Sequence, residues 1–240
     1  MKSFNLTKSA ILLLTTLCIS ITLLKAQPVV NKEIALIGFS QIYVTTGIEL
    51  IITQGNTESA KIVTTDNLID AVVVEQTGSK VNISWKPIRS TKKAWLQKTA
   101  KVYLNYKTLA LIDVSDGSAL KTTNSIKTNS LEAAVASGAI ITAQLDCGGL
   151  NLKTSSGASA TLAGTVKNME LTSSSGSLIN AFDLIAEQAN ITASSGADVK
   201  VNALKTIAVS SQSGAKVSYK GNATLNDHSA GKSGSVKKVN

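Results

Sequence analysis

The sequence predicts an all-β fold, a parallel β-helix in which coils of about 20 residues stack into a solenoid. The first observation is a phrase of a polar residue, a glycine and a small residue that occurs seven times in the 240-residue chain. Its glycines are Gly117, Gly138, Gly157, Gly176, Gly196, Gly214 and Gly234. The second observation is their near-constant spacing of 21, 19, 19, 20, 18 and 20 residues. The third is the composition, because 43% hydrophobic residues with only 4% aromatic ones suit a thin aliphatic core.

The N-terminal segment of residues 1–26 is predicted to be a signal peptide. Its start is basic, residues 10–24 are largely apolar, and Ala26 ends a usable cleavage site before Gln27. The alternatives are a membrane anchor, for which the apolar run is short, and a lipid anchor at Cys18, which follows an unsuitable lead-in. The sequence therefore predicts an exported protein of the periplasm, the outer cell surface or the extracellular space. No transmembrane span is expected after cleavage.

Cleavage would leave Cys147 as the single cysteine and would lower the net charge from +9 to +6. One cysteine forms no internal disulfide, so packing and ladder hydrogen bonds must hold an exported fold together. Cys147 precedes two glycines and is predicted to be a semi-buried, unreactive thiol.

Residues 34–108 are predicted to form an N-terminal β region. Period-two alternation predicts strands, and residues 67–70 predict one helical turn. A β-hairpin is expected around Gly78, because glycine supplies the positive φ that a tight turn needs. The stretch 86–101 gathers six basic residues. It is predicted to be a solvated loop rather than a nucleic-acid site, while attraction to an acidic surface polymer or a lipid headgroup stays open.

The repeat coils span residues 109–221. In one unit Leu150, Leu152 and Thr154 alternate with polar residues, so the geometry of a strand sends these three to the core. A second short strand follows each glycine, and Ser159 on it is assigned to the outer face. A coil this short buries its apolar side only by stacking on its neighbours. Each phrase glycine is predicted to occupy a corner where a Cβ would be penalised, and these corners are predicted to stack in one column.

Three stretches carry a family resemblance, together with the Ser-Gly-Ala corners. They are Phe-Ser-Gln-Ile-Tyr-Val at 39–44, Ile-Glu-Leu-Ile-Ile-Thr-Gln-Gly at 48–55 and Leu-Ile-Asp at 68–70. On these residues the chain resembles the putative auto-transporter adhesin, head GIN domain family of exported Gram-negative proteins, over residues 34–221. The resemblance implies a right-handed β-helix of the pectate-lyase-like class, followed by a last partial repeat and tail at 222–240. It carries no established binding residues.

Residues suited to catalysis are sparse. His228 is the only histidine, and it lies near the C-terminus in the run Asn-Asp-His-Ser, as a surface residue of the tail would. With no partner histidine and no reactive cysteine context, the sequence predicts neither a Ser-His-Asp site nor a histidine-based metal site. A polysaccharide lyase or hydrolase needs clustered carboxylates. The aspartates fall at differing offsets from the corner glycines and predict no such column: Asp113, Asp116, Asp146, Asp183 and Asp198. We therefore predict no catalytic residue, no cofactor and no metal site.

The predicted function is that of a non-catalytic adhesin that binds through the Ser/Thr-rich outer faces of its coils. A surface glycan or another component of the cell envelope is the expected partner, nucleic acid is not, and self-association stays open. The alternative is a carbohydrate-active enzyme with its site on one face of the solenoid.

Overall fold

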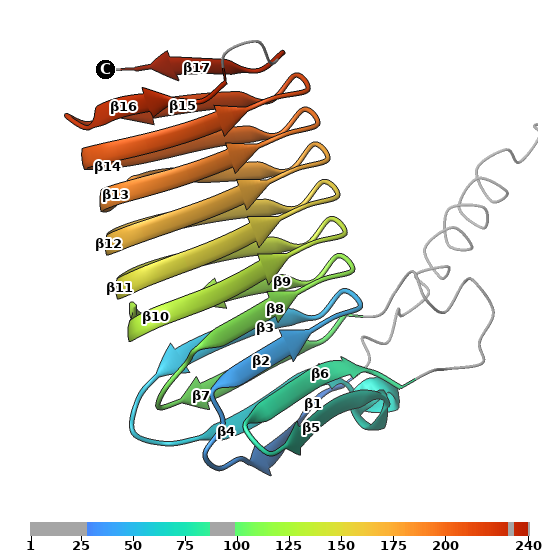
Figure 1. The fold of residues 1–240 in the computed structure, drawn as a ribbon. Coiled ribbons are helices and arrows are strands. Elements are labelled where there is room, and N and C mark those ends of the chain that lie inside the picture. The colour runs from blue at the N-terminus through green and yellow to red at the C-terminus, as the bar shows by residue number, and fades with distance from the viewer. Residues whose placement is uncertain (1–27, 87–98, 230–232, 240) are drawn as a thin grey trace, which may run out of the picture.

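The computed structural model describes residues 28–86, 99–229 and 233–239. Its strands stack into one elongated solenoid, with the N-terminal strands at one end and the last strands at the other (Figure 1). Strands make up 68% of the structure and helix 3%, in about seven turns of roughly 19 residues, which confirms the predicted all-β solenoid. The predicted signal peptide and most of the stretch 86–101 lie outside the described residues.

One hydrogen-bonded sheet of seventeen strands runs through the described residues. The N-terminal strands are β1 (Val29–Ala35), β2 (Gln41–Val44), β3 (Glu49–Gln54), β4 (Ser59–Thr65), β5 (Val72–Thr77), β6 (Lys80–Trp85) and β7 (Lys101–Tyr106). The later strands are β8 (Leu111–Val114), β9 (Ala119–Thr122), β10 (Ile126–Val135), β11 (Ile140–Thr154), β12 (Ser159–Ser173), β13 (Leu178–Ala193), β14 (Asp198–Ser211), β15 (Lys216–Lys220), β16 (Thr224–Asp227) and β17 (Ser235–Lys238). The 3-10 helix η1 (Asp66–Ala71) and the antiparallel pair β5–β6 confirm the predicted helical turn and hairpin.

Each long strand makes most of one coil. Strand β12 alternates inward and outward residues, and it bends near Gly164 without leaving the ladder. Gly164 has a φ of 112°, and a Cβ here would collide with the carbonyl oxygen of Leu145 on the coil before. The sequence predicted two or three short strands in each coil. In β12 this close approach of two backbones keeps the strand hydrogen-bonded around the bend. Strands β13 and β14 also run through their bends, with a register shift between Ala181 and Ile185 of β13.

Tight type I′ turns close the coils. In the turn at residues 155–158 both central residues are left-handed, Ser156 with a φ of 53° and Gly157 with a φ of 70°. The N–H of Ala158 donates to the carbonyl of Ser155 at 3.1 Å. Five further corners between residues 116 and 214 repeat these angles. The residue before each of these glycines therefore also adopts the left-handed conformation, which the sequence analysis had assigned to glycine alone.

Thr46 and Gly47 form one more corner, which the sequence analysis missed. Their φ values are 68° and 73°, and the N–H of Gly47 donates to the carbonyl of Asp116 at 3.0 Å. The coil of β2 and β3 pairs in parallel with β8 and β9 on one side and with β6 and β7 on the other. The predicted N-terminal β region thus supplies coils to the same solenoid. Its corner escaped notice because the phrase there is Thr-Thr-Gly, without a serine.

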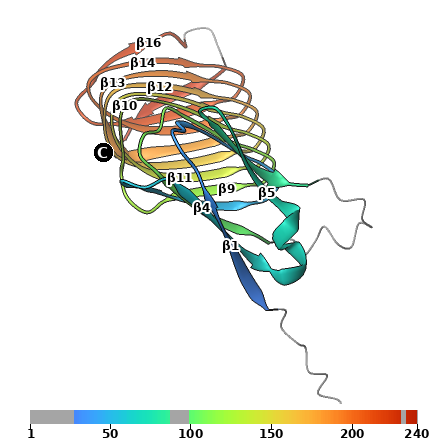
Figure 2. The same cartoon turned by 90° about the horizontal axis from the view of Figure 1, so that it is seen from below.

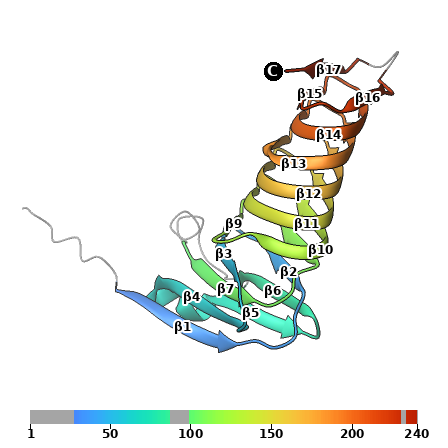
Figure 3. The same ribbon diagram turned by 90° about the vertical axis from the view of Figure 1, so that its left-hand side faces the viewer.

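Antiparallel strands cover the N-terminal end of the stack. Strand β4 pairs with β7, β1 pairs with β4, and β5 pairs with β6 (Figures 2 and 3). They satisfy backbone groups that an open coil would leave unpaired. At the other end β17 pairs in parallel with β15. Gly234 differs from the other six phrase glycines because its φ is not left-handed, and a Cβ there would collide with the backbone of Ser211.

The core is a thin column of mainly aliphatic side chains. One inward row is Leu131, Leu150, Met169, Ala189 and Ile207, all buried and aligned by the strand register. Leu152 and Thr154 are buried as predicted. Tyr106 is fully buried, and within the described part of the chain its hydroxyl has no hydrogen-bond partner. No helix among the described residues is long and apolar enough to cross a membrane.

Candidate ligand-binding face

The solenoid has two walls. Face A is made by the strand segments that lead into the corners, and face B by the segments that follow them. On face A the residues six positions before each corner glycine stack in an outward row. This row is Gln41, Leu111, Glu132, Asn151, Glu170, Asn190 and Ala208. Coils in a parallel sheet lie about 4.8 Å apart, so the backbones of Glu132 and Glu170 are about 10 Å apart, with Asn151 between them.

A second outward row lies four positions before the corner glycines. It is Tyr43, Asp113, Ala134, Lys153, Thr172, Thr192 and Ser210. Ala134 separates Asp113 from Lys153, and its methyl group is the smallest side chain of the row. Because this small residue lies between two larger ones, the wall is hollowed at Ala134.

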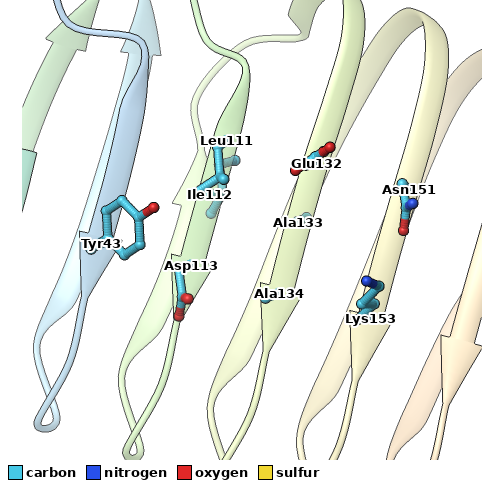
Figure 4. Close-up of a pocket in the computed structure, with 9 residues that line it drawn as sticks. All are labelled: Tyr43, Leu111, Ile112, Asp113, Glu132, Ala133, Ala134, Asn151 and Lys153. Atoms are coloured by element: carbon cyan, nitrogen blue, oxygen red, sulfur yellow. The ribbon is translucent and has the colours of Figure 1, made fainter. Parts of the chain in front are cut away.

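Two shallow hollows adjoin on face A. The first, of about 180 Å³, has Tyr43, Asp113 and Lys153 along one row and Glu132 and Asn151 along the other (Figure 4). The second, of about 340 Å³, continues along the stack and is lined mostly by carboxylate, amide and hydroxyl groups. Glu132 and Asn151 line both hollows. Face A therefore presents an extended polar depression that runs along the solenoid rather than one enclosed pocket.

The charges at the first hollow are partly balanced. Burial raises the pKa of Asp113, Lys80 opposes this shift, and Asp116 adds to it. The Nζ atom of Lys80 also lies 3.6 Å from the centroid of the Tyr43 ring. This cation–π contact keeps the ring of Tyr43 against its neighbour at the edge of the hollow.

Comparison with known proteins identifies the family. The family described as "Putative auto-transporter adhesin, head GIN domain" matches residues 38–223. The chain belongs to this family. This agrees with the resemblance found on residues 34–221. No curated protein matches the chain.

Solved structures share the fold of this head GIN protein. One is a putative adhesin from Bacteroides fragilis, with a TM-score of 0.75, 21% identity, and coverage of 89% of this chain and 98% of that one. A putative adhesin from Parabacteroides merdae has a TM-score of 0.70, 16% identity and coverage of 90% and 98%. A putative lipid binding protein from Parabacteroides distasonis has a TM-score of 0.63, 18% identity and coverage of 88% and 97%. At these identities the likeness establishes the fold alone.

The aspartates of this head GIN chain are scattered. Asp113 lies on face A, Asp116 in a corner, Asp146 and Asp183 towards the bends, and Asp198 on face B. Glu132 joins Asp113 in the first hollow, but the two carboxylates belong to different rows and coils (Figure 4). Within the described residues no three His, Cys, Asp or Glu side chains gather as a metal site would require.

Two further candidates for chemistry lie away from face A. Cys147 is buried, and burial together with the charge of Asp146 raises the pKa of its thiol to about 11. The thiol is therefore protonated at neutral pH and is a poor nucleophile. His228 is exposed just after β16.

The sequence predicts the corner glycines of the head GIN coils but not the polar rows beside them. Neither Glu132 nor Asn151 belongs to a chemical motif. Their common offset from the following glycine is the signal that could have revealed the row. Alignment of the repeats on their glycines, with outward positions compared down the columns, brings these residues together.

Proposed function

We propose that this head GIN protein is a non-catalytic adhesin of the cell envelope that binds an extended, hydroxyl-rich polymer, such as a surface glycan, along face A. The observation that carries the proposal is the row in which Glu132, Asn151, Glu170 and Asn190 alternate carboxylate and amide groups on successive coils. Carboxylates accept hydrogen bonds, and amides both donate and accept them. Such a row complements a chain of hydroxyl groups over several repeating units.

The backbone of the row is well suited to binding. Each of these residues stands on a strand that is hydrogen-bonded on both sides, so little backbone order has to be gained when a ligand binds. The hydroxyl-bearing row of Thr172, Thr192 and Ser210 runs beside it, in keeping with the predicted use of Ser/Thr-rich faces. Tyr43 adds an aromatic ring and a hydroxyl group at one end, beside the ammonium group of Lys80 that lies over the ring.

The family name and the adhesin-like neighbours support a binding role over a catalytic one. An enzyme that cleaves glycosidic bonds places a proton donor and a second carboxylate on opposite sides of one bond. Asp113 and Glu132 both line the first hollow from adjacent strands, so the test below also measures the release of sugar.

Binding to immobilised glycans, followed by titration of each positive glycan, tests the proposal. We expect the double variant Asn151→Ala, Glu170→Ala to bind about tenfold more weakly or worse. The double variant Thr142→Ala, Thr161→Ala on face B is the matched control and should bind as the unchanged protein does. Equal affinity of the face A variant, or release of reducing sugar from any bound glycan, would refute the proposal.

Export is part of the proposed function. It is supported by the family and by the N-terminal segment of residues 1–26. N-terminal sequencing of the protein from the periplasm or the culture medium should begin at Gln27 or within a few residues of it. Recovery of intact Met1 on a membrane-embedded chain would contradict this part of the proposal.

A further inference from the structure

Face B carries a compact group of lysines near the C-terminal end of the stack. We call Lys200, Lys216, Lys220 and Lys237 the basic patch. Lys238 follows on β17 but is in register with the inward Tyr219, so it is not part of this face. Strands β15 and β17 together have nine residues, of which four are lysines and none is acidic. Asp198 is the single acidic residue on the neighbouring strand β14.

The basic patch is flat and closely spaced. Lys200, Ser218 and Lys237 share one row, so the backbones of the two lysines lie two coils, or about 10 Å, apart. Lys216 and Lys220 lie on the same face of β15, about 13 Å apart along the strand. Among the described residues, no carboxylate lies within ion-pairing distance of any of these four lysines. Asp198 stands beside Lys216 in the same outward row and offsets part of the charge, so the patch keeps a net positive charge for a partner.

Exposed apolar side chains lie on the same face. Leu178 and Ile140 are 38% and 50% exposed. They share the outward row that continues through Asp198 to Lys216. A soluble polyanion would gain little from these side chains. The interfacial layer of a lipid bilayer accommodates both kinds of group, since phosphates attract lysine and the acyl boundary accepts leucine and isoleucine.

We propose that face B, through the basic patch together with Leu178 and Ile140, docks on the surface of a bilayer that contains anionic phospholipids. This is independent of the polymer binding assigned to face A. The two walls differ in charge, because the outward rows of face A carry Asp113, Glu132 and Glu170 against one lysine, Lys153. Docking through face B therefore turns face A away from the membrane, towards the polymer it binds.

Co-sedimentation with vesicles tests this docking. The exported chain, purified after N-terminal processing, is mixed with vesicles of phosphatidylcholine alone or with phosphatidylglycerol added. We expect binding only to the anionic vesicles, and loss of binding at high salt because the charges are screened. The triple variant Lys200→Gln, Lys216→Gln, Lys237→Gln should partition about 100-fold more weakly.

Two comparisons make the test specific. Lys32→Gln, Lys61→Gln, Lys107→Gln removes the same charge from the other end of the molecule and should leave vesicle binding within about threefold of the unchanged protein. Leu178→Ser should weaken vesicle binding but leave binding to soluble dextran sulfate unchanged. Circular dichroism checks that each variant is folded. Equal losses in the two lysine triples, no preference for anionic vesicles, or an unaffected Leu178→Ser variant would overturn the proposal.

Discussion

The backbone N–H of Gly157 donates a hydrogen bond of 3.1 Å to the carbonyl of Ser175, which occupies the equivalent corner one coil further on. The same bond joins Gly138 to Ser156 at 3.0 Å and Gly176 to Ser195 at 3.0 Å. The corners are therefore linked by a ladder of their own, in addition to the ladders of the two walls. A left-handed serine turns its carbonyl towards the neighbouring coil, where the glycine N–H meets it.

Replacement of the corner glycine Gly157 should lower the stability of the fold only because the backbone there is left-handed, with a φ of 70°. A Cβ at this position meets nothing within 4 Å, so the predicted penalty does not come from crowding of the next corner. We expect Gly157→Ala to lower the free energy of unfolding by about 1–2 kcal/mol, the cost of left-handed backbone with a side chain. Gly164→Ala should cost more, because its Cβ would collide with Leu145. Thermal melts of both variants beside Ser159→Val, an outward control, check this order; equal melting temperatures would contradict it.

A small buried hydroxyl cluster lies behind one corner. The hydroxyl of Ser177 lies 2.9 Å from that of Ser173 and 3.0 Å from that of Thr154, which are themselves 2.9 Å apart. Ser177→Ala should destabilise by about 1 kcal/mol, since it removes hydrogen bonds from buried partners. At most other corners the equivalent position is alanine, as at Ala158.

The cluster should also show strong non-additivity. The triple variant Thr154→Val, Ser173→Ala, Ser177→Ala removes every hydroxyl together and leaves none unpaired. Its loss of stability should be smaller than the sum of the three single losses. Urea titration of the single and triple variants measures the difference, and additive losses would show that the three hydroxyls act separately.

The sequence predicts the stacked coils because a glycine that recurs at a regular spacing in a β-rich chain marks a turn that is repeated in every coil. It did not predict the first hollow, because that site depends on Tyr43 lying beside Asp113, 70 residues later. Strands β4 to β7 lie between β3 and β8 in the chain and pack beside the coil of β2 and β3, and so interrupt the period at the position where the site is built. Glu132 and Asn151 escaped notice for another reason. They are far from each other in the sequence and match no known motif. Only the pairing of neighbouring strands places them side by side.

The thiol of Cys147 should make the fold sensitive to alkali. Burial raises its pKa from 9.0 to about 11, so the folded state favours the protonated thiol more than the unfolded state does. This contribution to stability is complete below pH 9 and is lost as the pH rises from about 9 to 11. Cys147→Ala should therefore flatten the fall in the free energy of unfolding across this window. Denaturant titrations at several pH values compare the slopes, and identical slopes would exclude the thiol as the cause.

The buried hydroxyl of Tyr106 should be a cost to the fold. It has no hydrogen-bond partner in the described structure, and burial raises its pKa. Tyr106→Phe keeps the ring and removes the unsatisfied group, so we expect stability to rise by about 1 kcal/mol. Tyr103→Phe, where the side chain is 43% exposed, is the matched control and should leave stability unchanged. A lower melting temperature for Tyr106→Phe would mean that the hydroxyl has a partner after all.

Thr46 is the most strained residue of the corner column. Its φ of 68° is left-handed, which is a conformational outlier for a β-branched side chain, and the other corners place serine or aspartate here. Asparagine tolerates this conformation better, so Thr46→Asn should raise the free energy of unfolding by about 1 kcal/mol.

The adjacent Thr45 provides the contrast. Its hydroxyl donates to the carboxylate of Asp116 at 2.5 Å and so ties the first coil to the next corner. Thr45→Asn should destabilise the fold because it removes this hydrogen bond, although it is the same threonine-to-asparagine substitution as at residue 46. Ser156→Asn, at a corner that already holds a small polar residue, should change little. If Thr46→Asn gained no more stability than Ser156→Asn, backbone strain at the first corner would not be a significant cost of the fold.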